Sequence, residues 1–146
     1  MGDCGITAID KEKKGTYSIG EQIMYDIIFY KDSKGIEPVK EYILSLFCND
    51  SKENRMRRNK IQDYIGILEE HGTRAGIPFV KPLGDGIWEL RPMDDRVLFF
   101  TYVNGKIILL SHFRKKTRKT PRREIEKAQK LREDYIRRNK DYEKKK

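Results

Sequence analysis

The chain has 146 residues, of which 38% are charged and 37% hydrophobic, and its formal net charge is +9 at pH 7. This length and composition predict one small domain with tails. The sequence contains neither an apolar run of membrane-spanning length nor a secretory-type N-terminus, so we expect a cytoplasmic location.

The positive charge is concentrated at the C-terminal end. Residues 114–146 hold 16 Lys or Arg against 6 Asp or Glu, an excess of ten, which leaves residues 1–113 with a net charge of −1. A one-sided basic segment predicts an anionic polymer as partner, either a nucleic acid or an acidic protein face. The alternative is a solvated, lysine-rich helix and tail.

Motifs for metals and cofactors are absent from the sequence. Cys4 and Cys48 lie far apart, and neither has a second cysteine or a histidine at zinc-ligand spacing. A single disulfide stays open, although a reduced cytosolic protein is the simpler interpretation. The sequence also lacks a phosphate-binding loop, a dinucleotide fingerprint, a nucleophile elbow and a zinc-protease motif, so we expect no cofactor and no metal.

The first predicted element is a strand. Residues 1–23 show no hydrophobic period, and we interpret them as a flexible extension or as sequence upstream of an internal start at Met24. The run MYDIIFY over Met24–Tyr30 is rich in β-branched and aromatic residues and is closed by the polar KDSKG, which predicts a buried strand.

Two helices are predicted next. Pro38 suits the first turn of a helix, and Ser51 can cap a second helix that ends at Gly72. Apolar residues recur with helical spacing in both, as Val39, Tyr42, Ile43, Leu46 and Phe47 and then as Ile61, Tyr64, Ile65 and Leu68. We expect a helical hairpin lying on a sheet.

An antiparallel meander of three strands follows. The strand-like runs are Ile87–Arg91, Val97–Val103 and Lys106–Phe113, with a turn at Met93–Asp95 between the first two. Asn104-Gly105 separates the last two, and this dipeptide is a strong hairpin signal because both residues accept positive φ. Within the first run, the WEL alternation is taken to point Trp88 and Leu90 to opposite faces. Packing is favoured over base stacking as the role of Trp88.

A basic helix closes the fold. Thr117 or Thr120 can cap it, and Pro121 fits its first position. Its narrow apolar face consists of Ile125, Ala128, Leu131 and Tyr135. We expect a folded α+β domain over residues 24–138 and a frayed basic tail over residues 139–146.

Cations at strand ends are the strongest candidates for chemistry. Arg91 ends one strand and Arg96 starts the next, Lys81 precedes this hairpin, and four cations follow the last strand: Lys115, Lys116, Arg118 and Lys119. Neighbouring strands lie about 4.8 Å apart, so such positions can converge and bind phosphate. The alternative for each single cation is a solvated surface charge.

Acid–base candidates are few. His112 ends a strand before the basic FRKK run and can face a substrate, although a structural role is the alternative. His71 sits at a helix end, where the helix dipole favours it. The adjacent pairs Glu69-Glu70 and Asp94-Asp95 do not face each other, so we predict no carboxylate dyad.

The segments MYDIIFYKDSKGIEPVKEYI, VKPLGDGIWELRP, RVLFFTYV, NGKIILL and FRKKTRKTPRREIEKA resemble the RelE/ParE toxin superfamily, in particular its phage-derived HigB-like branch. The resemblance spans Met24 to about Arg138. It implies an antiparallel sheet with two N-terminal helices packed on it. It also implies a type II toxin that cleaves mRNA on the ribosome, and a HigA-like helix-turn-helix antitoxin that represses the operon, so that operator DNA is reached only through the antitoxin.

The resemblance also implies residue roles. Arg91 and Arg96 are similar to the strand arginines of RelE-type active sites, and Lys116 lies where such toxins place a catalytic arginine. Lys115 and Arg118 are similar to neighbouring phosphate contacts, with Lys81 as a further RNA contact. Beyond the resemblance, we expect Lys119 to hold RNA together with these three. Relatives have His-Gly where this chain has Ser111-His112, and no aromatic occupies the place of the late tyrosine of RelE. His112, or a lysine of lowered pKa, is then the expected proton-transfer group.

The main hypothesis is therefore a metal-independent mRNA endoribonuclease that acts through the ribose 2′-OH. One rival is a toxin of the same fold that inhibits DNA gyrase without cutting RNA. A second is a non-catalytic nucleic-acid-binding protein, whose binding would be sensitive to salt.

Overall fold

The protein was analysed as a computed structural model that describes residues 24–145, with residues 140–145 described by their backbone alone. The extension expected over residues 1–23 lies outside the described residues. Five strands form one sheet: β1 (Asp26–Phe29), β2 (Val80–Gly84), β3 (Ile87–Leu90), β4 (Asp95–Tyr102) and β5 (Lys106–Arg114). Their order is β1-β5-β4-β3-β2, with β1 parallel to β5 and all other neighbours antiparallel. The predicted α+β class is confirmed.

The described residues form three α-helices, which are α2 (Pro38–Cys48), α3 (Lys52–His71) and α4 (Arg122–Lys145), and two short 3-10 turns, η1 (Gly72–Ala75) and η2 (Val103–Gly105). The sequence signals at the ends of α2 and α3 are confirmed. Pro38 occupies the first turn of α2, the Ser51 hydroxyl accepts a hydrogen bond from the Asn54 amide, and Gly72 ends α3 at φ 62°.

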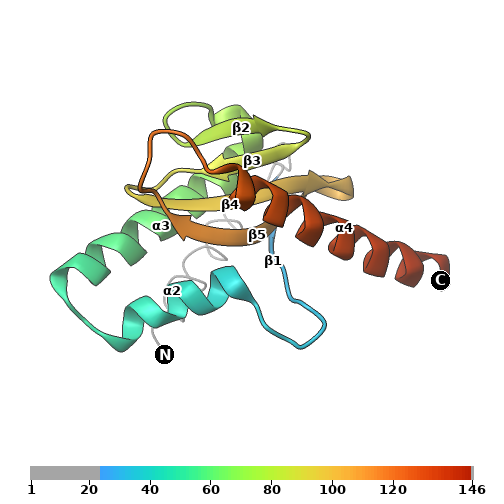
Figure 1. The fold of residues 1–146 in the computed structure, drawn as a ribbon, viewed down its shortest axis with the longest axis horizontal. Coiled ribbons are helices and arrows are strands. Elements are labelled where there is room, and N and C mark those ends of the chain that lie inside the picture. The colour runs from blue at the N-terminus through green and yellow to red at the C-terminus, as the bar shows by residue number, and fades with distance from the viewer. Residues whose placement is uncertain (1–23, 146) are drawn as a thin grey trace, which may run out of the picture.

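Helices cover both faces of the sheet (Figure 1). On one face, Val39 of α2 and Leu68 of α3 pack against alternate strand residues such as Val97 and Phe99. On the other, Ala128 of α4 packs against Leu98 and the remaining alternate residues. The two-residue period of strand side chains thus gives the sheet two apolar layers.

Three sequence predictions about the sheet were incomplete or wrong. The strand β2 was missed because Pro82 and Gly84 argue against a strand, yet proline is tolerated on an edge strand such as this one. Trp88 and Leu90 do not point to opposite faces. They are two residues apart on β3, so both pack on the α2/α3 layer, where the packing role of Trp88 is confirmed. Finally, the meander has a fourth strand, and β1 lies beside β5.

The start of α4 also differs from expectation. The helix begins at Arg122, and neither predicted cap is made: the Thr117 hydroxyl donates to the Lys119 carbonyl, while the Thr120 hydroxyl donates to Glu89 on β3. Near its other end, α4 is fixed to the end of β1 because Asp134 accepts from the Tyr30 hydroxyl and Arg138 donates to the Lys31 carbonyl. The helix continues to Lys145, beyond the expected domain boundary at residue 138.

Candidate nucleic-acid interface at one end of the sheet

All predicted strand-end residues gather at one end of the sheet. There β3 runs out into Arg91, β4 begins with Asp95 and Arg96, and β5 ends at Arg114. The ladder extends slightly further, since the Lys115 amide donates to the Asp94 carbonyl at 2.8 Å. The basic loop between β5 and α4 leaves the sheet from this point, so backbone topology alone brings strand arginines and loop lysines into one region.

Two of these arginines converge on one buried carboxylate. The Glu89 cluster, as we name it, consists of the side chains of Glu89, Arg91, Arg96 and Thr120. Glu89 is only 3% exposed, and its Oε2 lies 3.4 Å from Arg91 Nε and 4.0 Å from Arg96 Nε. Its Oε1 accepts a hydrogen bond from the Thr120 hydroxyl at 2.6 Å. The carboxylate therefore holds two cations side by side and ties the basic loop to the sheet.

The two arginines differ in how much they can offer a ligand. Arg96 is 7% exposed in its side chain, and its Nη1 donates to the carbonyls of Met93 (2.8 Å) and Asp95 (2.9 Å). Burial lowers the pKa of Arg96, although the charge of Glu89 opposes that shift. Arg91 is 24% exposed in its side chain, and its buried Nε makes no hydrogen bond within residues 24–145, although Glu89 Oε2 lies 3.4 Å away. Arg91 is thus the better placed of the two to contact a phosphate.

The loop cations surround this pair with exposed charge. Lys115, Lys116, Arg118 and Lys119 are all exposed. Lys81 is exposed as well, and it pairs with Glu89 across β2 and β3, which puts both side chains on the same face. Exposed cations beside a fixed arginine pair are an arrangement suited to an RNA backbone.

Removing the Thr120 hydroxyl is expected to release the basic loop. In Thr120→Val the Glu89 carboxylate loses the one hydroxyl donor that connects it to the loop, at a cost of about 1–2 kcal/mol in unfolding free energy. Trypsin should then cut faster at Lys115, Lys116, Arg118 and Lys119 than in the wild type. Thr101→Val, which changes an exposed threonine on β4, is the matched control. Equal cleavage of the loop in both variants would contradict the role of the Thr120–Glu89 hydrogen bond in holding the loop to the sheet.

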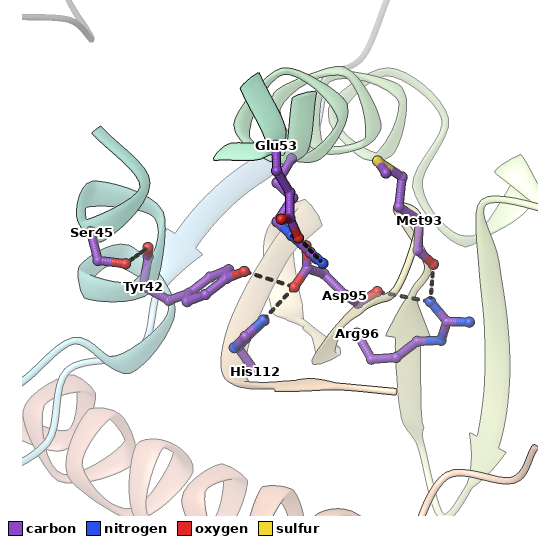
Figure 2. A network of polar contacts seen from close by, with 8 residues as sticks. Tyr42, Ser45, Glu53, Met93, Asp95, Arg96 and His112 are labelled. Carbon is purple, nitrogen blue, oxygen red and sulfur yellow. Dashed lines mark hydrogen bonds and ion pairs between the residues drawn. The ribbon is translucent and has the colours of Figure 1, made fainter. Parts of the chain in front are cut away.

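On the opposite face, a second carboxylate collects three donors. Asp95 is fully buried, and its Oδ1 accepts from the Tyr42 hydroxyl at 2.8 Å and lies 2.9 Å from His112 Nε2. Its Oδ2 accepts from Arg57 Nη1 at 3.1 Å. Arg57 is itself paired with Glu53. Figure 2 shows this Asp95 network, in which α2, α3, β4 and β5 each contribute a side chain, with Arg96 turned away toward Met93.

A β-bulge decides where His112 points. The pairing of β4 with β5 passes from Leu98↔Ser111 to Phe99↔Leu109, so Leu110 is an extra residue on β5. An extra residue reverses the inward and outward alternation after it. His112 thereby faces α2, where its ring stacks on Tyr42 with centroids 3.5 Å apart. The adjacent Ser111 hydroxyl is buried without a partner in the described part of the chain.

The network keeps Asp95 ionised. Burial favours a higher pKa for Asp95, but hydrogen bonds from His112 and Tyr42, together with the charge of Arg57, outweigh it and lower the pKa. The same contacts act on Tyr42 in the other direction: burial and then the bond to Asp95 raise the pKa of its hydroxyl. Asp95 is therefore a buried anion with three donors, which is the arrangement that a buried charge requires.

The structure brings only part of the predicted set together. Arg91 and Arg96 meet at Glu89, and the lysine loop begins beside them. His112 lies at the same end of the sheet but on the other face, joined to Asp95. Sequence reasoning set Asp95 aside together with Asp94, and it missed Arg57 and the arginine partners of Glu89. The one available signal was the two-residue period of the strand, which places Asp95 on the same face as Val97 and Phe99. Arg57, from a distant helix, had no such signal.

Two broader findings come from the described residues. Among residues 24–145, no group of three or more His, Cys, Asp or Glu side chains is placed to hold a metal ion, and Cys48 is a free, exposed thiol. In the same range, none of the helices is long and apolar enough to cross a membrane.

Comparison with known proteins gave one family. A family model described as phage-derived protein Gp49-like (DUF891) matches residues 51–133, which is more than half of the chain. The matched segment contains α3, the whole meander, the basic loop and the first half of α4, and therefore both clusters at the sheet end apart from Tyr42. No curated protein matches the chain at a significant level.

Proposed function

The chain belongs to the Gp49-like family of phage-derived proteins, a RelE/HigB-like toxin family, and from this premise we propose that it is an mRNA endoribonuclease that acts on the translating ribosome. The observation that carries the proposal is the Arg91–Arg96 pair held by buried Glu89 at the start of the basic loop. The family is associated with toxin–antitoxin modules. The cleavage chemistry and the ribosome as its place of action are the proposal.

The proposed reaction needs no metal. The ribose 2′-oxygen attacks the adjacent phosphorus, the bond from phosphorus to the 5′-oxygen breaks, and the products carry a 2′,3′-cyclic phosphate and a 5′-hydroxyl. Negative charge builds on the phosphate oxygens in the transition state. Fixed guanidinium groups aimed at that charge lower the barrier, because they need no reorganisation when the charge appears. Arg91 would contact the phosphate, with buried Arg96 behind it and Lys116 at the loop.

The remaining cations would hold the substrate. Lys81, Lys115, Arg118 and Lys119 are exposed along the route from the edge strand to the loop, where they would contact neighbouring phosphates. Because the arginine pair and His112 lie on opposite faces of the sheet, one phosphodiester would meet both only where the RNA passes over the strand ends. His112 is then the candidate for proton transfer.

The family implies an antitoxin partner, and we propose a HigA-like helix-turn-helix protein. It would reach operator DNA, whereas the toxin would reach DNA only through it. The exposed charges of α4, an amphipathic helix with one apolar side on the sheet, suit either ribosomal RNA or an acidic antitoxin segment. A cytoplasmic site of action follows from the proposed ribosomal substrate.

Induction of the protein without its antitoxin, followed by mapping of mRNA 5′ ends, tests the proposal. New ends should appear inside translated codons for the wild type, and they should fall at least about tenfold in Lys116→Ala. Lys60→Ala is the matched control, because Lys60 is an exposed lysine on α3, away from the sheet end. Growth arrest with intact mRNA would instead support a gyrase-type inhibitor. If the cells show no growth arrest and the mRNA no new ends, a non-catalytic nucleic-acid-binding protein is the hypothesis that remains.

A further inference from the structure

We propose that Asp95 is a positioning residue that holds His112 as its Nε2–H tautomer and leaves Nδ1 as the nitrogen that takes the 2′-hydroxyl proton. This inference rests on the proposed function, because it assigns a role within that reaction. The residues on which it rests lie on the opposite face of the sheet from the strand-end arginines, around the end of β5 that follows the bulge.

The geometry fixes the tautomer. An ionised carboxylate can only accept hydrogen bonds, so the contact of 2.9 Å from His112 Nε2 to Asp95 Oδ1 requires the hydrogen on Nε2. The lowered pKa of Asp95 supports its ionised state. A neutral imidazole carries only one hydrogen, and therefore its Nδ1 has a free lone pair. Within residues 24–145, Nδ1 has no hydrogen-bond partner, and 12% of the side chain is exposed.

The ring is also held in orientation. Tyr42 stacks on it with an interplanar angle of 18° while donating its hydroxyl to the same Asp95 oxygen. The carboxylate in turn cannot rotate, because its second oxygen is held by Arg57. A base held at two points loses little freedom when the substrate arrives, which is what proton transfer in a fixed geometry requires.

The charged groups around His112 come from four elements. They are Tyr42 on α2, Arg57 with its partner Glu53 on α3, Asp95 on β4 and Arg114 on β5. Arg114 pairs opposite Asp95 across the strands and is exposed; burial raises the pKa of the Tyr42 hydroxyl, and the nearby Arg114 opposes that shift. Because Arg114 follows His112 by two residues on β5, both side chains leave the strand on the same face. An anion bound by Arg114 would therefore lie beside the imidazole.

The proton balance closes within this site. His112 Nδ1 accepts the proton of the 2′-hydroxyl as the new oxygen–phosphorus bond forms, and the resulting imidazolium is stabilised by the Asp95 carboxylate. The bond from phosphorus to the 5′-oxygen breaks, and that oxygen takes a proton from water. The imidazolium then returns its proton to solvent, which restores the starting state.

The presence of only two histidines makes the tautomer directly measurable. Long-range proton–nitrogen NMR correlations on the full chain should show neutral His112 with hydrogen on Nε2 and a deprotonated Nδ1. His71 supplies an internal reference for an exposed histidine, whose Nε2 lies 3.6 Å from the exposed Glu70 carboxylate. A wild-type His112 with its hydrogen on Nδ1 would overturn the proposal without any variant being needed.

Activity supplies the second readout. In a translation reaction, Asp95→Asn should lower cleavage on the order of 10²-fold, because the imidazole is no longer held in one tautomer and orientation. Asp63→Asn is the matched control. It replaces an exposed carboxylate on α3 that lies outside the Asp95 network, and it should keep the wild-type rate.

The outcomes distinguish the positioning role of Asp95 from the proposed function. If the wild type cleaves mRNA and folded Asp95→Asn keeps the wild-type rate, the positioning role is wrong and the proposed function stands. If the folded wild type makes no cuts, the proposed function fails, and the catalytic role of the pair fails with it. Should Asp95→Asn fail to fold, the wild-type tautomer together with the rate of His112→Gln decides: an undiminished rate in that variant overturns the proposal.

Discussion

Replacement of Arg91 by alanine is expected to lower mRNA cleavage about 10²- to 10³-fold. Arg91 is the partly exposed arginine of the Glu89 cluster, and its Nε has no hydrogen-bond partner within the described chain. Loss of one fixed donor at the developing charge removes stabilisation that the exposed loop lysines cannot replace. The rate of cleavage is measured from the mRNA fragments that form in translation reactions supplied with purified protein.

Two further variants make this result specific. Arg91→Lys keeps the charge but loses the planar fork, so it should recover only part of the rate. Arg74→Ala removes an exposed arginine on η1 and should cleave like the wild type. Arg96→Ala is a weaker test, because Arg96 also holds the turn before β4 through the Met93 carbonyl. Full activity in folded Arg91→Ala would contradict the assignment of the phosphate site.

Asp95→Ala is expected to reduce the free energy of unfolding at pH 7 by about 3–5 kcal/mol. Asp95 is fully buried, and its removal leaves the buried Arg57 without its inner partner and two further donors unpaired. Asp94→Ala is the matched control, since Asp94 is exposed and its change should cost no more than about 0.5 kcal/mol. Urea unfolding of both variants measures the difference, and equal costs would refute the network as a source of stability.

The contribution of Asp95 should also depend on pH. Its pKa in the folded protein is lowered, after burial is outweighed by the His112 and Tyr42 hydrogen bonds and the Arg57 charge. A carboxyl with a lowered folded pKa stabilises the fold fully above its unfolded value of about 3.9, and that stability is lost as pH falls through the folded value. Wild-type unfolding free energy should therefore fall below about pH 4 more steeply than that of Asp95→Ala. Parallel curves would contradict an ionised Asp95 in the fold.

Local signals predicted the helices and the hairpin well. Pro38, Ser51 and Gly72 each act within one helical turn of their own position, and Asn104-Gly105 adopts positive φ at both residues, as a tight connection needs. The same local rules failed where tertiary context decides. Pro82 is compatible with a strand only because that strand is at an edge, and nothing near β1 in sequence indicates that it pairs with β5.

The candidate site shows the same division. Positions such as Arg91 and Arg96 could be predicted because one turn connects them. The face on which His112 lies depends on the bulge at Leu110, and the partners of Asp95 come from helices that are up to 53 residues away in sequence. Long-range hydrogen bonds of this kind leave no periodic pattern in the chain. The sequence therefore could not show that the predicted residues lie on two different faces of the sheet.

Analysis of the cleaved ends tests the central claim most directly. Purified protein would be added to ribosomes translating one defined mRNA, and to the same mRNA without ribosomes. We expect fragments only in the first reaction, with a 2′,3′-cyclic phosphate or 3′-phosphate on the upstream piece and a 5′-hydroxyl on the downstream piece. Intact mRNA in both reactions, or downstream fragments that carry a 5′-phosphate, would contradict this claim.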